Sequence, residues 1–218
     1  MDPIADFIER YLSPGSVAFD IGANRGDYAR AMLAKAGSVY AFEPNPEMAT
    51  VLRSSIEDAR MQVIRSAVGD QTGPVEFHID RRAGLDAMAS SVHRLDGMGG
   101  MTETVTVECT TLDGFCAARR IAPSFIKIDT EGNEGAVFAG AQRTIRRHRP
   151  FIVFEFWESW WRRGVSDIFK MLAPRYDLIV LGTGEDAAAL YAEHGDDGTQ
   201  TGSVDIGCIP KARRWFGF

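Results

Sequence analysis

Acidic residues follow three short apolar runs in the first third of the chain. Asp20 closes the first run, Glu43 comes directly after the second, and Asp70 lies a few residues beyond the third. If these runs form parallel strands, the acids gather at the edge of the sheet where ligands bind in such folds. An acid after the second strand can accept hydrogen bonds from both hydroxyls of a ribose. An acid after the third can accept one from an adenine amino group.

The first acid opens a turn that is rich in small residues, Asp20-Ile21-Gly22-Ala23-Asn24-Arg25-Gly26. Gly22 and Gly26 allow a sharp turn and a close approach of a ligand, and Asn24 tolerates a left-handed conformation. The turn lacks the GxGxxG spacing of dinucleotide-binding folds, and an acid here favours a ligand with an ammonium group over a pyrophosphate. Each acid alone is equally typical of a solvated strand end or a turn. In this order they outline a nucleoside with a positively charged tail, which S-adenosylmethionine matches.

A second set of residues can accept a proton from a substrate hydroxyl. Asp129 ends the apolar run 125–129, and Glu131 follows it, although Glu131 is also typical of the first turn of a helix. Glu155 interrupts another apolar run, where a buried acid requires a partner. His93 is a fourth candidate, although a loop histidine is more often solvated. The three carboxylates can also hold a divalent cation, but no His or Cys lies at matching spacing, so we predict no metal site.

A sheet is needed to bring these residues together, and the apolar runs predict one. The predicted elements are a helix at 3–12, a strand at 17–21, a helix at 27–36, a strand at 39–42, a helix from 46 to about 60, strands at 61–64, 75–79, 104–108 and 125–129, a helix from 134 to about 148, and strands at 151–156, 176–181 and 204–209. Residues 83–101 are rich in Gly, Met and Ser and predict a mobile loop. Alternating strands and helices predict an α/β protein with a doubly wound, seven-stranded sheet.

The composition is that of a globular protein, with 218 residues of which 45% are hydrophobic and 25% charged. We therefore expect a single domain over residues 1–218. No apolar run reaches the roughly 18 residues of a membrane-spanning helix, so we expect no membrane contact. The net charge of −6 disfavours nucleic acid as a partner. Three cysteines without a CxxC motif, and a start without the features of a secretory signal, predict a cytoplasmic protein.

From about residue 15 to residue 156, the chain resembles the FkbM family of S-adenosylmethionine-dependent methyltransferases. The two motifs most specific to this family are Glu43-Pro44-Asn45-Pro46 and Lys127-Ile128-Asp129-Thr130-Glu131-Gly132. Further matching segments, in the expected order, are residues 17–26, Ala67-Val68-Gly69-Asp70, Ser90-Ser91 and Thr111-Leu112-Asp113. The segment that follows Val153 departs from the family pattern because it is unusually aromatic.

The resemblance implies a class I methyltransferase fold, Rossmann-like, with strand order 3-2-1-4-5-7-6 and the last strand antiparallel. It implies methyl transfer to an oxygen of a sugar, a polyketide or another small hydroxylated metabolite. Ser90 and Ser91 would bring a loop over the site. The cofactor-binding residues that we expect are Asp20, Gly22, Asn24, Gly26, Glu43, Pro44, Asp70, Ser91 and Asp129.

Three alternatives stay open at this point. The sequence does not distinguish an oxygen from a nitrogen acceptor, so an N-methyltransferase is one of them. An NAD-dependent oxidoreductase is opposed by the missing GxGxxG motif, and a non-catalytic partner subunit is opposed by intact motifs at three strand ends. The basic, aromatic segment 211–218 fits docking on the chain itself or on a second subunit, which leaves a homodimer open.

Overall fold

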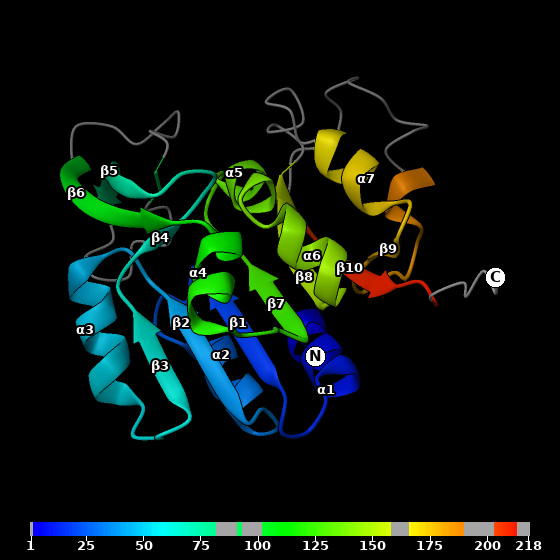
Figure 1. Ribbon diagram of the computed structural model, residues 1–218, viewed down its shortest axis with the longest axis horizontal. Helices are drawn as coiled ribbons and strands as arrows, with labels where there is room; N and C mark the ends of the chain where they lie inside the picture. The colour runs from blue at the N-terminus through cyan, green and yellow to red at the C-terminus, as the bar shows by residue number, and fades with distance from the viewer. Residues whose placement is uncertain (1, 82–90, 93–101, 158–165, 190–202, 213–218) are drawn as a thin grey trace.

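A central sheet of seven strands organises the protein (Figure 1). The computed structural model describes residues 2–81, 91–92, 102–157, 166–189 and 203–212. The sheet has the order β3-β2-β1-β7-β8-β10-β9, made from β1 (Val17–Ile21), β2 (Ser38–Phe42), β3 (Met61–Ile64), β7 (Phe125–Ile128), β8 (Phe151–Trp157), β9 (Tyr176–Val180) and β10 (Ser203–Pro210). Neighbours are parallel except at β10, which is antiparallel to both β8 and β9. Numbered within this sheet alone, the order is 3-2-1-4-5-7-6, and the predicted fold class is confirmed.

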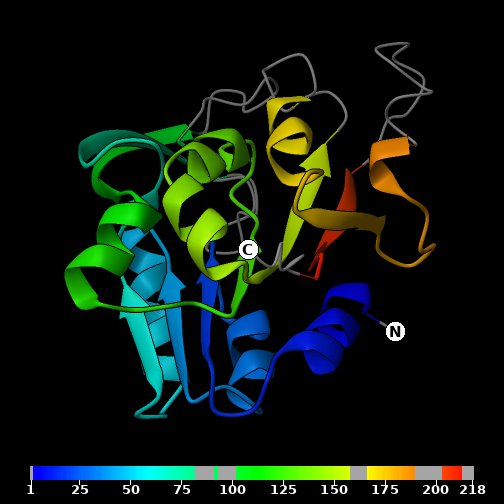
Figure 2. The same cartoon turned by 45° about the vertical axis from the view of Figure 1, so that its right-hand side comes forward.

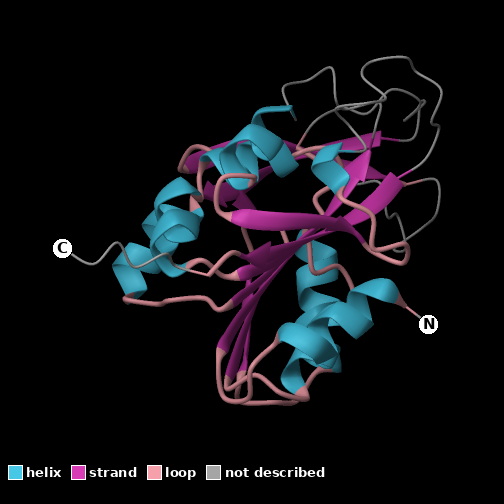
Figure 3. Cartoon of the chain, turned by 90° about the vertical axis from the view of Figure 1, so that its right-hand side faces the viewer, coloured by secondary structure: helices cyan, strands magenta, loops and turns pink. Residues whose placement is uncertain are grey.

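Helices cover both faces of the sheet, as the edge-on view in Figure 3 shows. One face packs against α4 (Leu112–Arg119), α5 (Glu134–Ala139), α6 (Gln142–His148) and α7 (Ser166–Leu172). The other packs against α1 (Pro3–Tyr11), α2 (Asp27–Leu33) and α3 (Pro46–Ser55), and α1 lies beside α2 (Figure 2). Successive side chains of a strand point to opposite faces, so Phe19 joins the first layer and Ala18 the second. A sheet buried on both faces requires such apolar strands.

A second, three-stranded sheet has the order β4-β6-β5 (Figure 1). Its strands are β4 (Ala67–Val68), β5 (Gly73–Asp80) and β6 (Thr102–Thr110), with β5 antiparallel and β4 parallel to β6. The alternating runs predicted at 75–79 and 104–108 are therefore strands, but they lie outside the main sheet. Of the predicted loop 83–101, only Ser91 and Val92 fall within the described residues.

Three helix predictions were wrong in their extent by more than one residue, and the helix predicted at 27–36 ends at Leu33. The helix predicted from 134 to 148 is divided into α5 and α6 at Gly140, where the backbone contacts residue 69. A Cβ atom at Gly140 would lie 2.0 Å from the carbonyl oxygen of Gly69. The helix predicted to reach residue 60 ends at Ser55, because Ile56 adopts an extended conformation. No described helix is both long and apolar enough to cross a membrane.

Candidate functional site

A cavity of about 350 Å³ lies at the carboxyl ends of β1, β2 and β7. Its walls come from the turn at residues 22–25, the segment 43–45, the segment 66–68 and the β7 end at residues 127–131. Phe77 of β5 and Val92 complete the lining from the second sheet and the segment next to it. Both the size and the place are typical of a small-molecule site in a doubly wound fold.

The turn after β1 presents backbone and one amide side chain to the cavity. Gly22 has φ 77° and Asn24 has φ 47°, so the expected left-handed conformation of Asn24 is present. A Cβ atom on Gly22 would lie 1.7 Å from the carbonyl oxygen of Asp129, so only glycine fits between the turn and the end of β7. The side-chain oxygen of Asn24 is buried and has no hydrogen-bond partner among the described residues. It is therefore an acceptor that a ligand can use.

Glu43 is a buried acid that lines the cavity next to Pro44. One carboxylate oxygen accepts a hydrogen bond from the backbone N–H of Asn24, and the other accepts one from the N–H of Asn45, both at 2.8 Å. Burial raises the pKa of Glu43 to about 7, although these two hydrogen bonds oppose the rise. A carboxylate oxygen can accept a further hydrogen bond, so Glu43 keeps acceptor capacity for two hydroxyl groups of a ligand.

Lys127 of β7 links this strand to β1 through its ammonium group. Its ammonium lies 3.4 Å from Asp20 Oδ1 and 3.2 Å from Asp129 Oδ2, and it donates a hydrogen bond of 3.1 Å to the carbonyl oxygen of Gly22. Asp20 is fully buried and does not itself line the cavity, whereas Lys127 does. Asp20 thus lies behind Lys127 rather than at the surface of the site.

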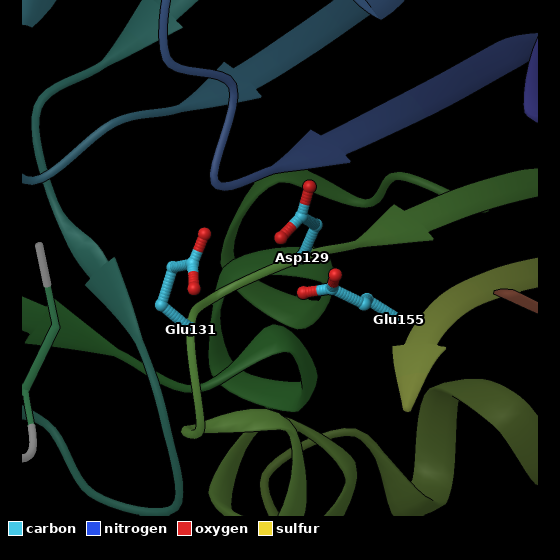
Figure 4. A group of neighbouring side chains, drawn as sticks. All are labelled: Asp129, Glu131 and Glu155. Atoms are coloured by element: carbon cyan, nitrogen blue, oxygen red, sulfur yellow. The ribbon is translucent and has the colours of Figure 1, made fainter. Parts of the chain in front are cut away.

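Three of the predicted catalytic acids converge at the ends of β7 and β8. Figure 4 shows the carboxylates of Asp129, Glu131 and Glu155 facing a common space, and one oxygen of each lies within 4.8 Å of the others. Burial, and after it the charges of Asp129, Glu155 and Glu134, raise the pKa of Glu131 to about 8. Carboxylates this close can share a proton or hold a divalent cation.

Glu134, at the start of α5, holds the loop that carries Glu131. Its Oε1 accepts hydrogen bonds from the N–H and the hydroxyl of Thr130, both at 2.8 Å, and its Oε2 accepts one from the N–H of Gly132 at 3.1 Å. Glu131 itself has φ 54° and lies before the helix. The helix-start role that the sequence left open for Glu131 therefore belongs to Glu134.

The remaining predicted residues lie at different distances from the cavity. Asp70 is exposed and absent from the lining. Gly26 is the N-cap of α2, where it packs against Leu52. Ser91 is buried, exchanges two backbone hydrogen bonds with His78, and places its hydroxyl 3.5 Å from the Thr130 carbonyl oxygen. Ser90 and His93 lie outside the described residues.

The sequence of residues 20–177 matches the family described as the methyltransferase FkbM domain. The chain belongs to the FkbM methyltransferase family. The match begins at residue 20, within the segment 15–156 that resembles the family, and continues past residue 156 to residue 177; it includes every cavity-lining strand end described above. No curated protein matches the sequence significantly.

Solved structures with the same fold are only distantly similar in sequence. The FkbM methyltransferase of Methylobacillus flagellatus KT is 18% identical, with a TM-score of 0.55, over 90% of this chain and 44% of that one. This chain therefore spans less than half the length of that relative. An rRNA methylase of Streptococcus thermophilus is 10% identical, with a TM-score of 0.55, in an alignment that covers 96% of this chain and 97% of that one. The putative methyltransferase SMU.1697c of Streptococcus mutans, solved in complex with SAH, is 11% identical, with a TM-score of 0.55, over 97% and 99%.

Not all of the FkbM motifs lie at the cavity. In the Thr111-Leu112-Asp113 motif, the Asp113 carboxylate accepts hydrogen bonds from the backbone N–H groups of Arg143 and Thr144 at the start of α6. This motif therefore fastens α4 to α6. Sequence reasoning also missed Tyr28, which lines the cavity with its ring 5.2 Å from the Lys127 ammonium. A lysine inside the apolar strand 125–128 was the available signal for this part of the site.

Proposed function

We propose that this FkbM-family protein transfers a methyl group from S-adenosylmethionine to an oxygen of a small hydroxylated metabolite. The observation that supports it most is that one cavity is lined both by Glu43 and by the pair Asp129 and Glu131. Glu43 fits a ribose, and the pair lies where a carboxylate can take a proton from an acceptor. A single cavity of this kind can hold the donor and the acceptor side by side.

The residues at the turn fit the donor. The unpartnered oxygen of Asn24 can accept a hydrogen bond from the ammonium of the methionine part, and Gly22 lets the turn pass close to the end of β7 beside the cavity. Met48, Ala67 and Val68 provide apolar lining for a purine. Asp70 stays a prediction as the acceptor for the adenine amino group, and so do Gly26 and Ser91 as cofactor contacts.

When bound, S-adenosylmethionine supplies a methyl group on a sulfonium, which is a good leaving group. The protein must then align the acceptor and remove its proton. We assign proton removal to Glu131, because a base with a pKa near the working pH is effective and burial raises the pKa of Glu131 to about 8. Asp129 and the neighbouring Glu155 orient the acceptor hydroxyl, and Phe77 and Val92 provide apolar lining that excludes water.

Isothermal titration of S-adenosylmethionine and S-adenosylhomocysteine into the purified protein, with NAD as the control ligand, tests the donor. Binding of both sulfur compounds without NAD is the expected result, and binding of NAD instead would favour an oxidoreductase. Incubation with a panel of hydroxylated and amino acceptors and methyl-labelled donor follows. Label on oxygen supports the assignment, whereas label on nitrogen alone would replace it by N-methylation. Binding without label transfer to any acceptor would favour a cofactor-binding partner subunit.

A further inference from the structure

Lys127 is a buried charge that the proposed reaction does not consume. Its side chain is 4% exposed, in a strand whose other residues are Phe125, Ile126 and Ile128. Burial alone lowers the pKa of an ammonium, but the carboxylates of Asp129 and Asp20 outweigh it and hold the pKa of Lys127 above its ordinary value. A buried lysine is costly unless it is fully paired, so this one must have a structural or a functional reason to be charged.

Strand pairing explains why Lys127 meets these partners. Asp20 of β1 lies directly opposite Lys127 of β7 in the parallel register. Asp129 is two residues further along the same strand direction, which places it on the same side as Lys127. An ammonium has three protons to donate, and here three oxygens lie within 3.4 Å, on Asp20, Asp129 and Gly22.

Two of these three partners belong to the cavity. Gly22 and Asp129 both line it, and their backbones are in such close contact that a Cβ on Gly22 would meet the Asp129 carbonyl oxygen at 1.7 Å. A small displacement of either would therefore move the other. Because its ammonium lies among these three protein oxygens, Lys127 is placed to hold Gly22 and Asp129 rather than to serve mainly as a ligand contact.

On the basis of the proposed function, we propose that Lys127 is a positioning residue, which holds the Gly22 turn and the Asp129 carboxylate in the arrangement that the cofactor requires. The competing explanation is that Lys127 only neutralises the buried Asp20. The two explanations differ in what happens when both charges are removed together.

The experiment compares K127M, D20N and the double variant D20N/K127M with the wild-type chain, by thermal unfolding and by calorimetric titration of S-adenosylhomocysteine, which needs no acceptor. K127M leaves Asp20 buried without its cation, so both the melting temperature and the affinity should fall. In D20N, Lys127 keeps its contacts with Asp129 and Gly22, so the Kd for S-adenosylhomocysteine should stay within about threefold of the wild-type value. The double variant should regain most of the melting temperature but bind at least about tenfold more weakly, because the turn is no longer held.

A double variant with wild-type affinity would overturn the proposal, since Lys127 would then serve only to balance Asp20. If D20N alone lost as much affinity as the double variant, the proposal would also be overturned, because Asp20 and not Lys127 would then determine binding. If the wild-type chain itself fails to bind, the proposed function is wrong and this inference falls with it, a result distinct from the other two. K170M, at an exposed lysine of α7 that pairs with Asp167, is the matched control and should change neither measurement.

Discussion

Replacing Glu43 by alanine tests the donor site most directly. Glu43 is 6% exposed, and both of its carboxylate oxygens accept hydrogen bonds from backbone N–H groups, so it presents its remaining acceptor capacity in a fixed place. A hydrogen bond to a charged group contributes about 1.5–3 kcal/mol. If E43A loses two hydrogen bonds to the ribose hydroxyls, each at the low end of this range, the binding free energy weakens by about 3 kcal/mol, which raises Kd about 100-fold.

The assay is calorimetric titration of S-adenosylmethionine and S-adenosylhomocysteine at pH 8, where Glu43, with a pKa raised to about 7 by burial, is mostly ionised. Both ligands should lose affinity alike, because they share the ribose. Wild-type affinity should also weaken as the pH falls through 7, since a protonated Glu43 is a poorer acceptor, and the E43A variant should lack this dependence.

E43A also leaves the N–H groups of Asn24 and Asn45 without their acceptor, at a cost of about 1–3 kcal/mol each. Thermal unfolding must therefore confirm that the variant is folded. The matched control is E47A, because Glu47 is exposed at the start of α3 and pairs with Arg81. A surface pair contributes little, so its Kd should stay within about twofold of wild type. A folded E43A with a Kd within about threefold of wild type would refute the ribose assignment.

Four further outcomes are expected. E131Q should lower kcat by about 10²–10⁴-fold while S-adenosylhomocysteine still binds, and the wild-type rate should rise with pH through about 8, because the base must lose its proton. G22A should lose ligand binding and melt at a lower temperature, since the new Cβ would meet Asp129 at 1.7 Å. The free energy of unfolding, measured in urea, should fall from pH 5 to pH 8 by up to about 3 kcal/mol for Glu43 alone. The reason is that burial raises the pKa of Glu43 and of Glu134 to about 7, so the native state keeps protons that the unfolded state has released. Methyl transfer should continue in the presence of EDTA. Loss of activity in EDTA would indicate that Asp129, Glu131 and Glu155 bind a divalent cation.

The individual strands and the place of the site could be predicted because their signals are local or repeat along the chain. Apolar runs alternate with helical segments at short intervals, and acids mark the ends of β1, β2 and β7. The turn at Gly22 and Asn24 could be predicted for the same reason, since its conformation depends on the residue types within it. The resemblance to the FkbM family supplied the strand order, which the apolar runs alone do not determine.

The misplaced features depend on contacts between distant segments. After β3, the chain enters β4, which pairs with β6 some 40 residues later, and Gly69 donates a backbone hydrogen bond to the Thr110 carbonyl. This pairing carries Asp70 out of the main sheet and to the surface. The same approach of Gly69 to Gly140 divides the long helix into α5 and α6. The residue patterns within 61–70 and 134–148 do not indicate the pairing of β4 with β6 or the contact between Gly69 and Gly140.

The acids at the ends of β7 and β8 are better explained by reactivity than by stability. Glu155 lies directly opposite Asp205 of β10 in the antiparallel register, and like charges opposite each other destabilise a sheet. Burial and the charges of Glu155 and Asp129 raise the pKa of Asp205 to about 6, and a similar set of causes raises the pKa of Glu131 to about 8. Hence a proton from an acceptor would enter a group of carboxylates whose mutual repulsion favours its uptake. An apolar residue at Glu155 would remove part of the repulsion that raises the pKa of Glu131, the base that we propose.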